Sequence, residues 1–116
     1  MRIEAYRNED KYPNKYMLEY ISENPNASSE TLDRLSNHGS WRVLQNIPKH
    51  PNTSAKTLDK LSRNKSVASI SLINIVNHPN TATETIENLA NSKRVTVSRA
   101  AKEELSKRKQ QQSKGN

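Results

Sequence analysis

The chain of 116 residues has no cysteine, no phenylalanine and only two glycines. The absence of cysteine excludes disulfides, thiolate metal sites and cysteine-ligated iron–sulfur clusters. Two glycines, at positions 39 and 115, are too few for a glycine-rich phosphate-binding loop. The short motifs of serine hydrolases and zinc proteases are also missing from the sequence. We therefore expect no enzyme activity, no cofactor and no metal.

Apolar residues are also scarce, at 31% of the chain, against roughly 45–50% in an average globular protein. A compact sphere would be difficult to fill with so few apolar side chains, whereas an elongated stack needs less core per residue. No stretch approaches the roughly 18 apolar residues of a membrane-spanning helix, and the N-terminus lacks the apolar stretch of a signal peptide. The sequence therefore predicts a cytoplasmic protein with no membrane partner.

The net charge of +7 is concentrated at one end of the chain. Residues 92–116 contain eight lysines and arginines but only two acidic residues, Glu103 and Glu104, whereas residues 1–91 are nearly neutral. A basic segment of this kind is typical of contacts with nucleic-acid phosphates. Basic side chains near the end of a helix also interact favourably with the helix dipole, so charge alone does not decide between a binding role and a structural one.

The strongest pattern is an internal repeat. Residues 24–36, 50–62 and 78–90 align without gaps, and their prolines, at positions 25, 51 and 79, give periods of 26 and 28 residues. Apolar residues recur three positions apart within each segment and again in the stretch before it, which predicts two buried columns on helices. The first column contains Leu32, Leu35, Leu58, Leu61, Ile86 and Leu89, and the second contains Leu18, Ile21, Leu44, Ile47, Leu72 and Ile75.

Each aligned segment is expected to be a turn that opens a short helix, because the residue before a proline avoids the helical conformation. Thr81 and Glu84 have the spacing of a capping box. Thr53 supplies the cap without the glutamate, and Ala27 cannot cap, so we expect the caps to weaken toward the N-terminus. Pro48 should end its helix early and leave a single turn or a 3-10 helix.

The two aligned periods differ by two residues, and the alignment suggests where the difference lies. Counting forward from each segment places Trp41 in the same position as Val67 and Val95. This alignment assigns the extra residues to the middle of the stretch 67–75. It also predicts that Trp41, the single tryptophan, is buried in the core or between repeats.

The cadence Asn-Pro-Asn-Thr-x-x-Glu-x-Leu-x-x-Leu-Ala, preceded by a short apolar helix, resembles the leucine-rich repeat variant family and, more loosely, HEAT-like α-solenoids. The match covers about residues 16–105 and is best in residues 50–62 and 78–90. The resemblance implies a right-handed superhelix of stacked helix pairs, in which one helix is often 3-10. The periods here are longer than the typical unit of that family, and its members share no common activity, so the resemblance concerns the fold.

The sequence thus predicts an all-α chain that forms a short right-handed α-solenoid of about three and a half helix–turn–helix repeats of 26–28 residues, some of the helices 3-10. We expect an N-terminal extension over residues 1–15, a helical repeat domain over residues 16–105, and a disordered, basic polar tail over residues 106–116. Such a scaffold presents an extended surface on which exposed positions vary freely.

Histidines and paired acids were considered as sites of chemistry. His50 and His78 precede the aligned prolines, but packed helices lie ~8–10 Å apart, too far for one metal ion bound at ~2 Å. Both are interpreted as turn residues, like Asn24 in the first segment, and His38 as a surface residue. Asp33 and Asp59 also align, with Glu87 after them. A solvated row on the polar helix face is a better reading than an acid–base pair.

Two function classes remain, and we rank a non-enzymatic protein-binding scaffold or adaptor above a nucleic-acid-binding protein. Tyr6 and Tyr12 lie outside the repeats and are the candidate protein contacts. Tyr16 and Tyr20 are expected to cover the N-terminal end of the stack. The candidate contacts with nucleic acid are the basic residues Lys93, Arg94, Arg99, Lys102, Lys107, Arg108 and Lys109.

Overall fold

The computed structural model describes residues 15–38 and 40–115, and every regular element in that part of the chain is a helix. The prediction of an all-α chain is therefore confirmed. The elements are α2 (Lys15–Glu23), α3 (Ser29–Leu35), α4 (Trp41–Asn46), the 3-10 helix η1 (Ile47–Lys49), α5 (Ala55–Ser62), α6 (Ser69–Asn77), α7 (Thr83–Leu89) and α8 (Val95–Gly115). Tyr6 and Tyr12 lie outside the described residues.

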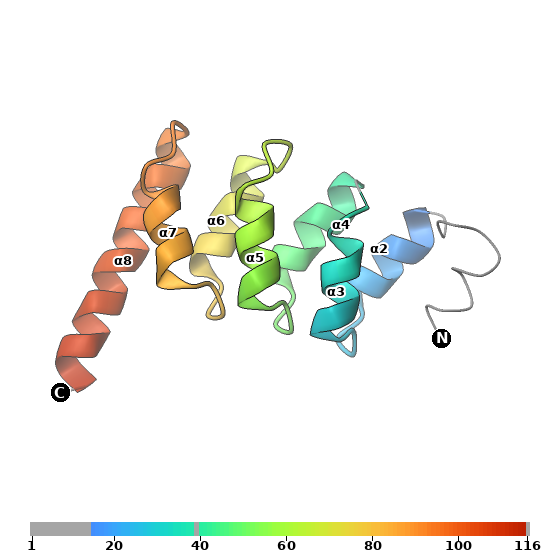
Figure 1. Cartoon of the computed structure of the whole chain (residues 1–116), viewed down its shortest axis with the longest axis horizontal. Coiled ribbons are helices and arrows are strands. Elements are labelled where there is room, and N and C mark those ends of the chain that lie inside the picture. Colours follow the sequence, from blue (N-terminus) through green and yellow to red (C-terminus); the bar gives the residue numbers. More distant parts are fainter. Residues whose placement is uncertain (1–14, 39, 116) are drawn as a thin grey trace.

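The helices form two layers in a slab of 52 × 32 × 17 Å (Figure 1). One layer contains α3, α5 and α7, and the other contains α2, α4 with η1, α6 and α8. Neighbours within the second layer are in contact, and the layers contact each other where α2 meets α3, α5 meets α6 and α7 meets α8. Because the chain alternates between layers, the helices of the first layer run upward in Figure 1 and those of the second run downward.

The core lies between the two layers, and both predicted columns are buried in it. The six side chains of the first column are at most 6% exposed, and the six of the second are at most 8% exposed. Val43, Val76 and Val97 are completely buried beside them. The three-residue spacing of apolar positions therefore identified the packed faces correctly, since residues three apart lie on one face of a helix.

The cap prediction was wrong by one residue. Ser28 and Ser54 are the N-caps of α3 and α5, and their hydroxyls accept hydrogen bonds from the backbone N–H groups of Thr31 and Thr57. Ala82 occupies the N-cap position of α7 and forms no side-chain cap. The side-chain caps are therefore present in the first two segments and missing in the third, opposite to the predicted trend.

Thr53 and Thr81 face inward, away from the helix starts that they were expected to cap. The Oγ1 atom of Thr53 donates to the backbone oxygen of Ile47 at 2.7 Å, and that of Thr81 donates to Ile75 at 2.5 Å. Each hydroxyl adds a second hydrogen bond to a carbonyl near the end of the preceding helix, which also accepts from the backbone N–H of His50 or His78. A buried threonine is stable at this position because its polar atom is paired.

The extra two residues of the longer period lie in the loop between α5 and α6. The segment from the first residue of α3 to that of α4 spans positions 29–41, and from α7 to α8 it spans 83–95, but from α5 to α6 it spans 55–69. They were expected in the middle of the stretch 67–75, but α6 is continuous from Ser69 to Asn77, so they precede that helix. Pro48 does end α4 early, and a 3-10 turn follows, as predicted.

The last helix, α8, continues to Gly115. The expected domain boundary at residue 105 is thus not the end of a secondary-structure element, and residues 106–115, expected to be disordered, are helical in the structure. Leu105 is half-buried against the core. Among the helices of residues 15–38 and 40–115, none combines the length and apolar character that crossing a bilayer requires.

Candidate functional site

The aligned segments are joined by a ladder of histidine side chains. The Nε2 atom of His50 lies 2.8 Å from the backbone oxygen of Asn24, and that of His78 lies 2.8 Å from the backbone oxygen of His50. Each Nδ1 accepts from a backbone N–H two residues later, that of Asn52 or Asn80, at 3.0 Å. Because Nδ1 accepts, Nε2 must carry the proton and donate it.

The histidines are therefore structural links, and the turn-residue interpretation was correct but incomplete. Both are 5% exposed, and the described residues contain no cluster of metal-ligating side chains. Asn52 reinforces the ladder, because its Nδ2 atom donates to the backbone oxygens of Pro25 and Ala27 at 3.3 and 3.0 Å. Asn80 makes the equivalent bonds to Pro51 and Thr53. The turns are thus fixed to one another along the lower side of Figure 1.

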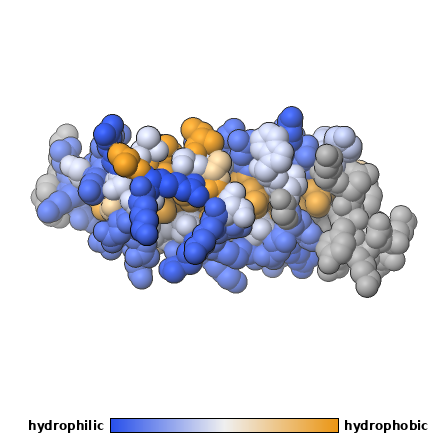
Figure 2. Space-filling model, turned by 90° about the horizontal axis from the view of Figure 1, so that it is seen from above, coloured by the Kyte–Doolittle hydropathy of each residue, from blue (hydrophilic) through white to orange (hydrophobic). Residues whose placement is uncertain are grey.

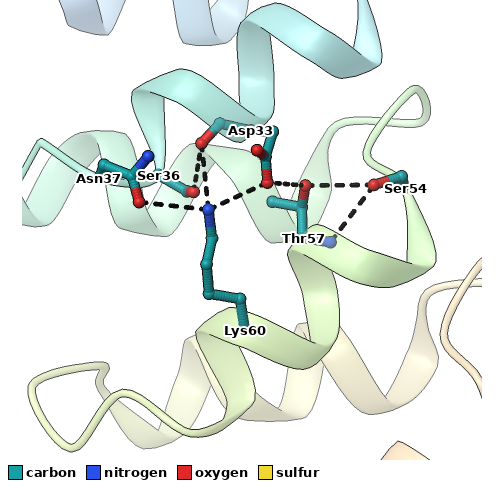
Figure 3. Close-up of polar contacts among 6 residues, drawn as sticks. All are labelled: Asp33, Ser36, Asn37, Ser54, Thr57 and Lys60. Atoms are coloured by element: carbon teal, nitrogen blue, oxygen red, sulfur yellow. Dashed lines mark hydrogen bonds and ion pairs between the residues drawn. The ribbon is translucent and has the colours of Figure 1, made fainter.

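The aspartates provide a second set of links, between helices of the first layer. Asp33 on α3 accepts from the Thr57 hydroxyl of α5 at 2.8 Å and from Lys60 Nζ at 3.0 Å (Figure 3). Lys60 also reaches the backbone oxygen of Asp33 and Asn37 Oδ1. Asp59 repeats the arrangement with the hydroxyl of Thr85 on α7 at 2.7 Å.

These hydrogen bonds favour the ionised carboxylates. The hydrogen bond from Lys60, followed by that from Thr57, lowers the pKa of Asp33 below its ordinary value of 3.8. The hydrogen bond from Thr85, followed by that from Arg63, lowers the pKa of Asp59. Both aspartates are half-buried, so each is partly solvated and partly engaged by the neighbouring helix. A carboxylate with a lowered pKa and fixed partners is a poor general base near neutral pH.

Two of the basic residues singled out in the sequence form hydrogen bonds within the chain. Arg94 is committed to the loop between α5 and α6, because its Nη1 atom donates to the Val67 backbone oxygen at 2.7 Å and its Nη2 atom to that of Lys65 at 3.2 Å. Arg108 donates to Glu104 and to the Thr83 hydroxyl, both at 3.1 Å. Two of the seven candidates are therefore engaged within the chain.

The five remaining candidates, Lys93, Arg99, Lys102, Lys107 and Lys109, are exposed. Lys93 lies just before α8, and the other four are distributed along it. At ~1.5 Å per residue, the four on α8, from Arg99 to Lys109, span ~15 Å of helix. An open hollow of about 490 Å³ beside Arg99 and Lys102 is lined by α8 and by Ser92 of the preceding loop. It has no opposing wall and is a shallow surface.

The residues that sequence reasoning missed lie at the top of Figure 1. The second-layer helices α4, α6 and α8 all begin at this side of the slab. Trp41, Ile70 and Val95 lie within the first two residues of these helices and are 64%, 55% and 67% exposed. We call these three residues the apolar row. We call the side of the slab formed by residues 37–38, 40–42, 63–70 and 91–95 the upper edge.

Trp41 was expected to be buried, and that prediction was wrong. Its helix position corresponds to those of Ser69 and Val95, the first residues of α6 and α8, and not to that of the buried Val67. The extra residues in the loop before α6 cause this shift. Figure 2 looks down on the upper edge and shows hydrophobic side chains exposed along it among hydrophilic ones. Arg42 lies over the Trp41 ring, with its guanidinium carbon 5.2 Å from the ring centroid.

Comparison with known proteins gives no relative: no protein-family model, no curated protein and no solved structure matches the chain. The resemblance to the leucine-rich repeat variant family therefore stays a prediction. The properties of the site must be argued from the residues themselves.

Proposed function

We propose that this chain is a non-enzymatic, protein-binding module built as a short α-solenoid, and that its upper edge is the binding surface. The observation that carries this proposal is the apolar row. Singly scattered apolar side chains are normal on protein surfaces. Here three large ones occur at matching helix starts, on successive helices, along one edge. Large exposed apolar side chains with a polar surround are characteristic of protein interaction sites.

Several features support the solenoid part of the proposal. Equivalent residues form the same hydrogen bonds from one aligned segment to the next, as in the pairs His50–Asn24 and His78–His50. Contacts between neighbouring units are the defining interactions of a repeat stack. A right-handed superhelix of the leucine-rich repeat variant or HEAT-like type, located in the cytoplasm, is the form we expect.

Binding to nucleic acid is the second candidate. The exposed side chains of Lys93, Arg99, Lys102, Lys107 and Lys109 favour it, because each phosphate contact releases counterions and contributes to affinity. It ranks second because Arg94 and Arg108 bind groups within the chain. A protein partner also accounts for the exposed aliphatic side chains, which have no π face on which a base could stack.

The proposal is tested by affinity capture from nuclease-treated lysate with three baits. These are the wild type, a variant with Trp41→Ser, Ile70→Ser and Val95→Ser, and a control with Tyr20→Ser. Tyr20 is 57% exposed on α2 but lies outside the apolar row. A protein retained by the wild type and the control, and lost with the row variant, supports the proposal. Retention of the protein by all three baits would contradict the proposal. Capture by the wild type from untreated lysate but not from nuclease-treated lysate would also contradict it.

A further inference from the structure

The upper edge combines its apolar row with a strongly one-sided charge. Arg42, Lys65 and Lys93 are exposed on it, and the sequence has no aspartate or glutamate in residues 34–58, 60–83 or 88–102. Two carboxylates pair with cations of this edge: Asp59 Oδ2 lies 3.0 Å from Arg63 Nε, and Glu19 Oε1 lies 4.0 Å from Arg42 Nε. The exposed cations of this edge, Arg42, Arg63, Lys65 and Lys93, outnumber these two carboxylates. A partner that covers the edge therefore meets a net positive charge.

The opposite edge has the reverse character at several positions. Glu23, Glu30 and Glu84 are exposed there, at the end of α2 and in the first turns of α3 and α7. Carboxylates in a first helical turn are placed favourably with respect to the helix dipole. We call this opposite side of the slab the lower edge. It is a suitable internal control because it belongs to the same slab and also has exposed lysines.

From these features we propose that the upper edge binds an acidic segment of its partner protein in an extended, polyproline II-like conformation, with an apolar residue at every third position. This inference rests on the protein-binding function proposed above and specifies the chemistry of the partner.

The spacing of the apolar row determines the conformation. Adjacent packed helices lie ~8–10 Å apart, and α6 packs against α8, so Ile70 and Val95 mark two sites at about that interval. Trp41 begins the next helix of the same layer, α4. A polyproline II helix has three residues per turn and a rise of ~3.1 Å per residue, so every third side chain lies on the same face, ~9.3 Å apart. A β-strand alternates its faces, so residues three apart point in opposite directions.

The loops that present Ile70 and Val95 are held before any partner arrives. Arg94 bonds the backbone oxygens of Val67 and Lys65, which ties the loop before α8 to the loop before α6. Val67 is itself only 2% exposed. Binding to a preorganised surface loses less conformational entropy than binding to a loose one.

The single tryptophan lies in the proposed site, so its fluorescence reports occupancy directly. The probe is a synthetic peptide of three Leu-Glu-Pro units, titrated into the full-length protein at low salt. One control peptide has Gln in place of Glu, and the other has the same composition with the leucines placed consecutively. We expect the acidic, three-residue-periodic peptide to change Trp41 emission and to bind between about threefold and a hundredfold more tightly than the Gln peptide, since each exposed ion pair contributes little.

Matched lysine variants test which edge supplies the positive charge that binds the acidic peptide. Lys65→Ser with Lys93→Ser removes two cations from the upper edge, and Lys49→Ser with Lys56→Ser removes two exposed cations from the lower edge. The first pair should weaken the acidic peptide severalfold, and the second should leave its affinity within about twofold. Circular dichroism of both variants confirms that each has kept its helices.

The outcomes separate the inference from the function on which it rests. Equal affinity for the Gln peptide, or an equal loss of affinity in the two lysine variants, overturns the inference of an acidic partner. The proposed protein-binding function would still stand. Equal affinity for the consecutive-leucine peptide overturns the extended register, as does absence of binding by every peptide. A single-stranded RNA oligonucleotide that quenches Trp41 at lower concentration than any peptide, and displaces it, overturns both the inference and the proposed function.

Discussion

The imidazole of His78 donates from Nε2 to the backbone oxygen of His50, 28 positions earlier in the chain, at 2.8 Å. Both residues occupy the position before a proline, and both have extended backbone there, with ψ angles of 130° and 128°. The histidine side chain of one segment therefore forms a hydrogen bond with the backbone of the previous segment. This contact stabilises the stacking of segments, separately from the apolar columns.

Replacing His78 with asparagine should separate the local part of this interaction from the long-range part. Asn24 shows that an asparagine at this position can accept from the N–H two residues later, at 2.9 Å. Its shorter side chain cannot also reach the preceding segment. We expect His78→Asn to lower the free energy of unfolding by ~1–3 kcal/mol, the cost of an unpaired buried group. Urea denaturation measures this, with Glu87→Gln as an exposed control on α7; equal stability of the two variants would show that the ladder contributes nothing.

Leucine truncations should report how well each unit is packed. Leu58 is completely buried, so Leu58→Ala should cost ~2–5 kcal/mol. Leu105 is half-buried on α8, and Leu105→Ala should cost clearly less because fewer packing contacts are lost. Chemical denaturation of both variants gives the comparison. Equal losses would mean that α8 is packed as tightly near its middle as α5 is.

Acid should weaken the links between α3, α5 and α7. The pKa values of Asp33 and Asp59 are lowered by their partners in the folded chain, so folding is favoured while they are ionised, above the ordinary aspartate pKa of 3.8. That contribution is lost as the pH falls from this value through the lowered values. The denaturation midpoint should therefore depend less on pH between about 5 and 2 in an Asp33→Asn, Asp59→Asn variant than in the wild type. Parallel pH profiles would contradict this assignment.

Trp41 should behave as a solvent-exposed tryptophan in the free protein. With 64% of its surface exposed, it should emit at long wavelength and be quenched readily by acrylamide. Unfolding in urea should change both signals only slightly. Arg42→Ala removes the cation over the ring and should alter the emission intensity without changing the quenching by much. Blue-shifted emission that is protected from acrylamide would restore the original prediction of a buried position.

Deleting residues 106–116 tests the nucleic-acid alternative. The deletion removes Lys107, Arg108, Lys109 and Lys114 and takes the net charge from +7 to +3. If these side chains bind phosphates, the slope of log affinity against log salt should flatten by ~3–4. Because Arg108 bonds Thr83 on α7, we also expect a small loss of stability, which Arg108→Ala alone should reproduce. Our proposal expects protein binding to survive this deletion, and loss of protein binding would contradict it.

The core could be predicted from the sequence because the apolar residues recur with the spacing of one helix face. The caps and Trp41 were missed for reasons that a one-dimensional pattern does not contain. Thr53 has the chemistry of a cap, but its hydroxyl bonds Ile47 in the preceding helix, so tertiary structure overrides the local preference. Trp41 was misplaced because an insertion between two helices can belong to the loop or to the helix, and only the structure distinguishes these.

The recurrence of histidine was visible in the sequence, but the hydrogen-bonded ladder could not be inferred from it. His50 and His78 recur before proline, yet Asn24 occupies the first position, and both residue types suit a turn. The long-range acceptor is a backbone oxygen, which no sequence motif marks. The apolar row was hidden for a related reason. Ile70 and Val95 look like core residues in composition, and only the helix starts in the structure place them at a surface.

Each link of the histidine ladder uses the same kind of donor and the same kind of acceptor. The ladder therefore sets no limit on the number of segments that it joins. The backbone oxygen of His50 accepts the imidazole of His78 just as that of Asn24 accepts the imidazole of His50. A duplicate of residues 51–78 inserted after His78 would therefore find an acceptor in the unit before it and offer one to the unit after it. The molecule could be lengthened by whole units, and each added unit would extend the upper edge by one more helix start.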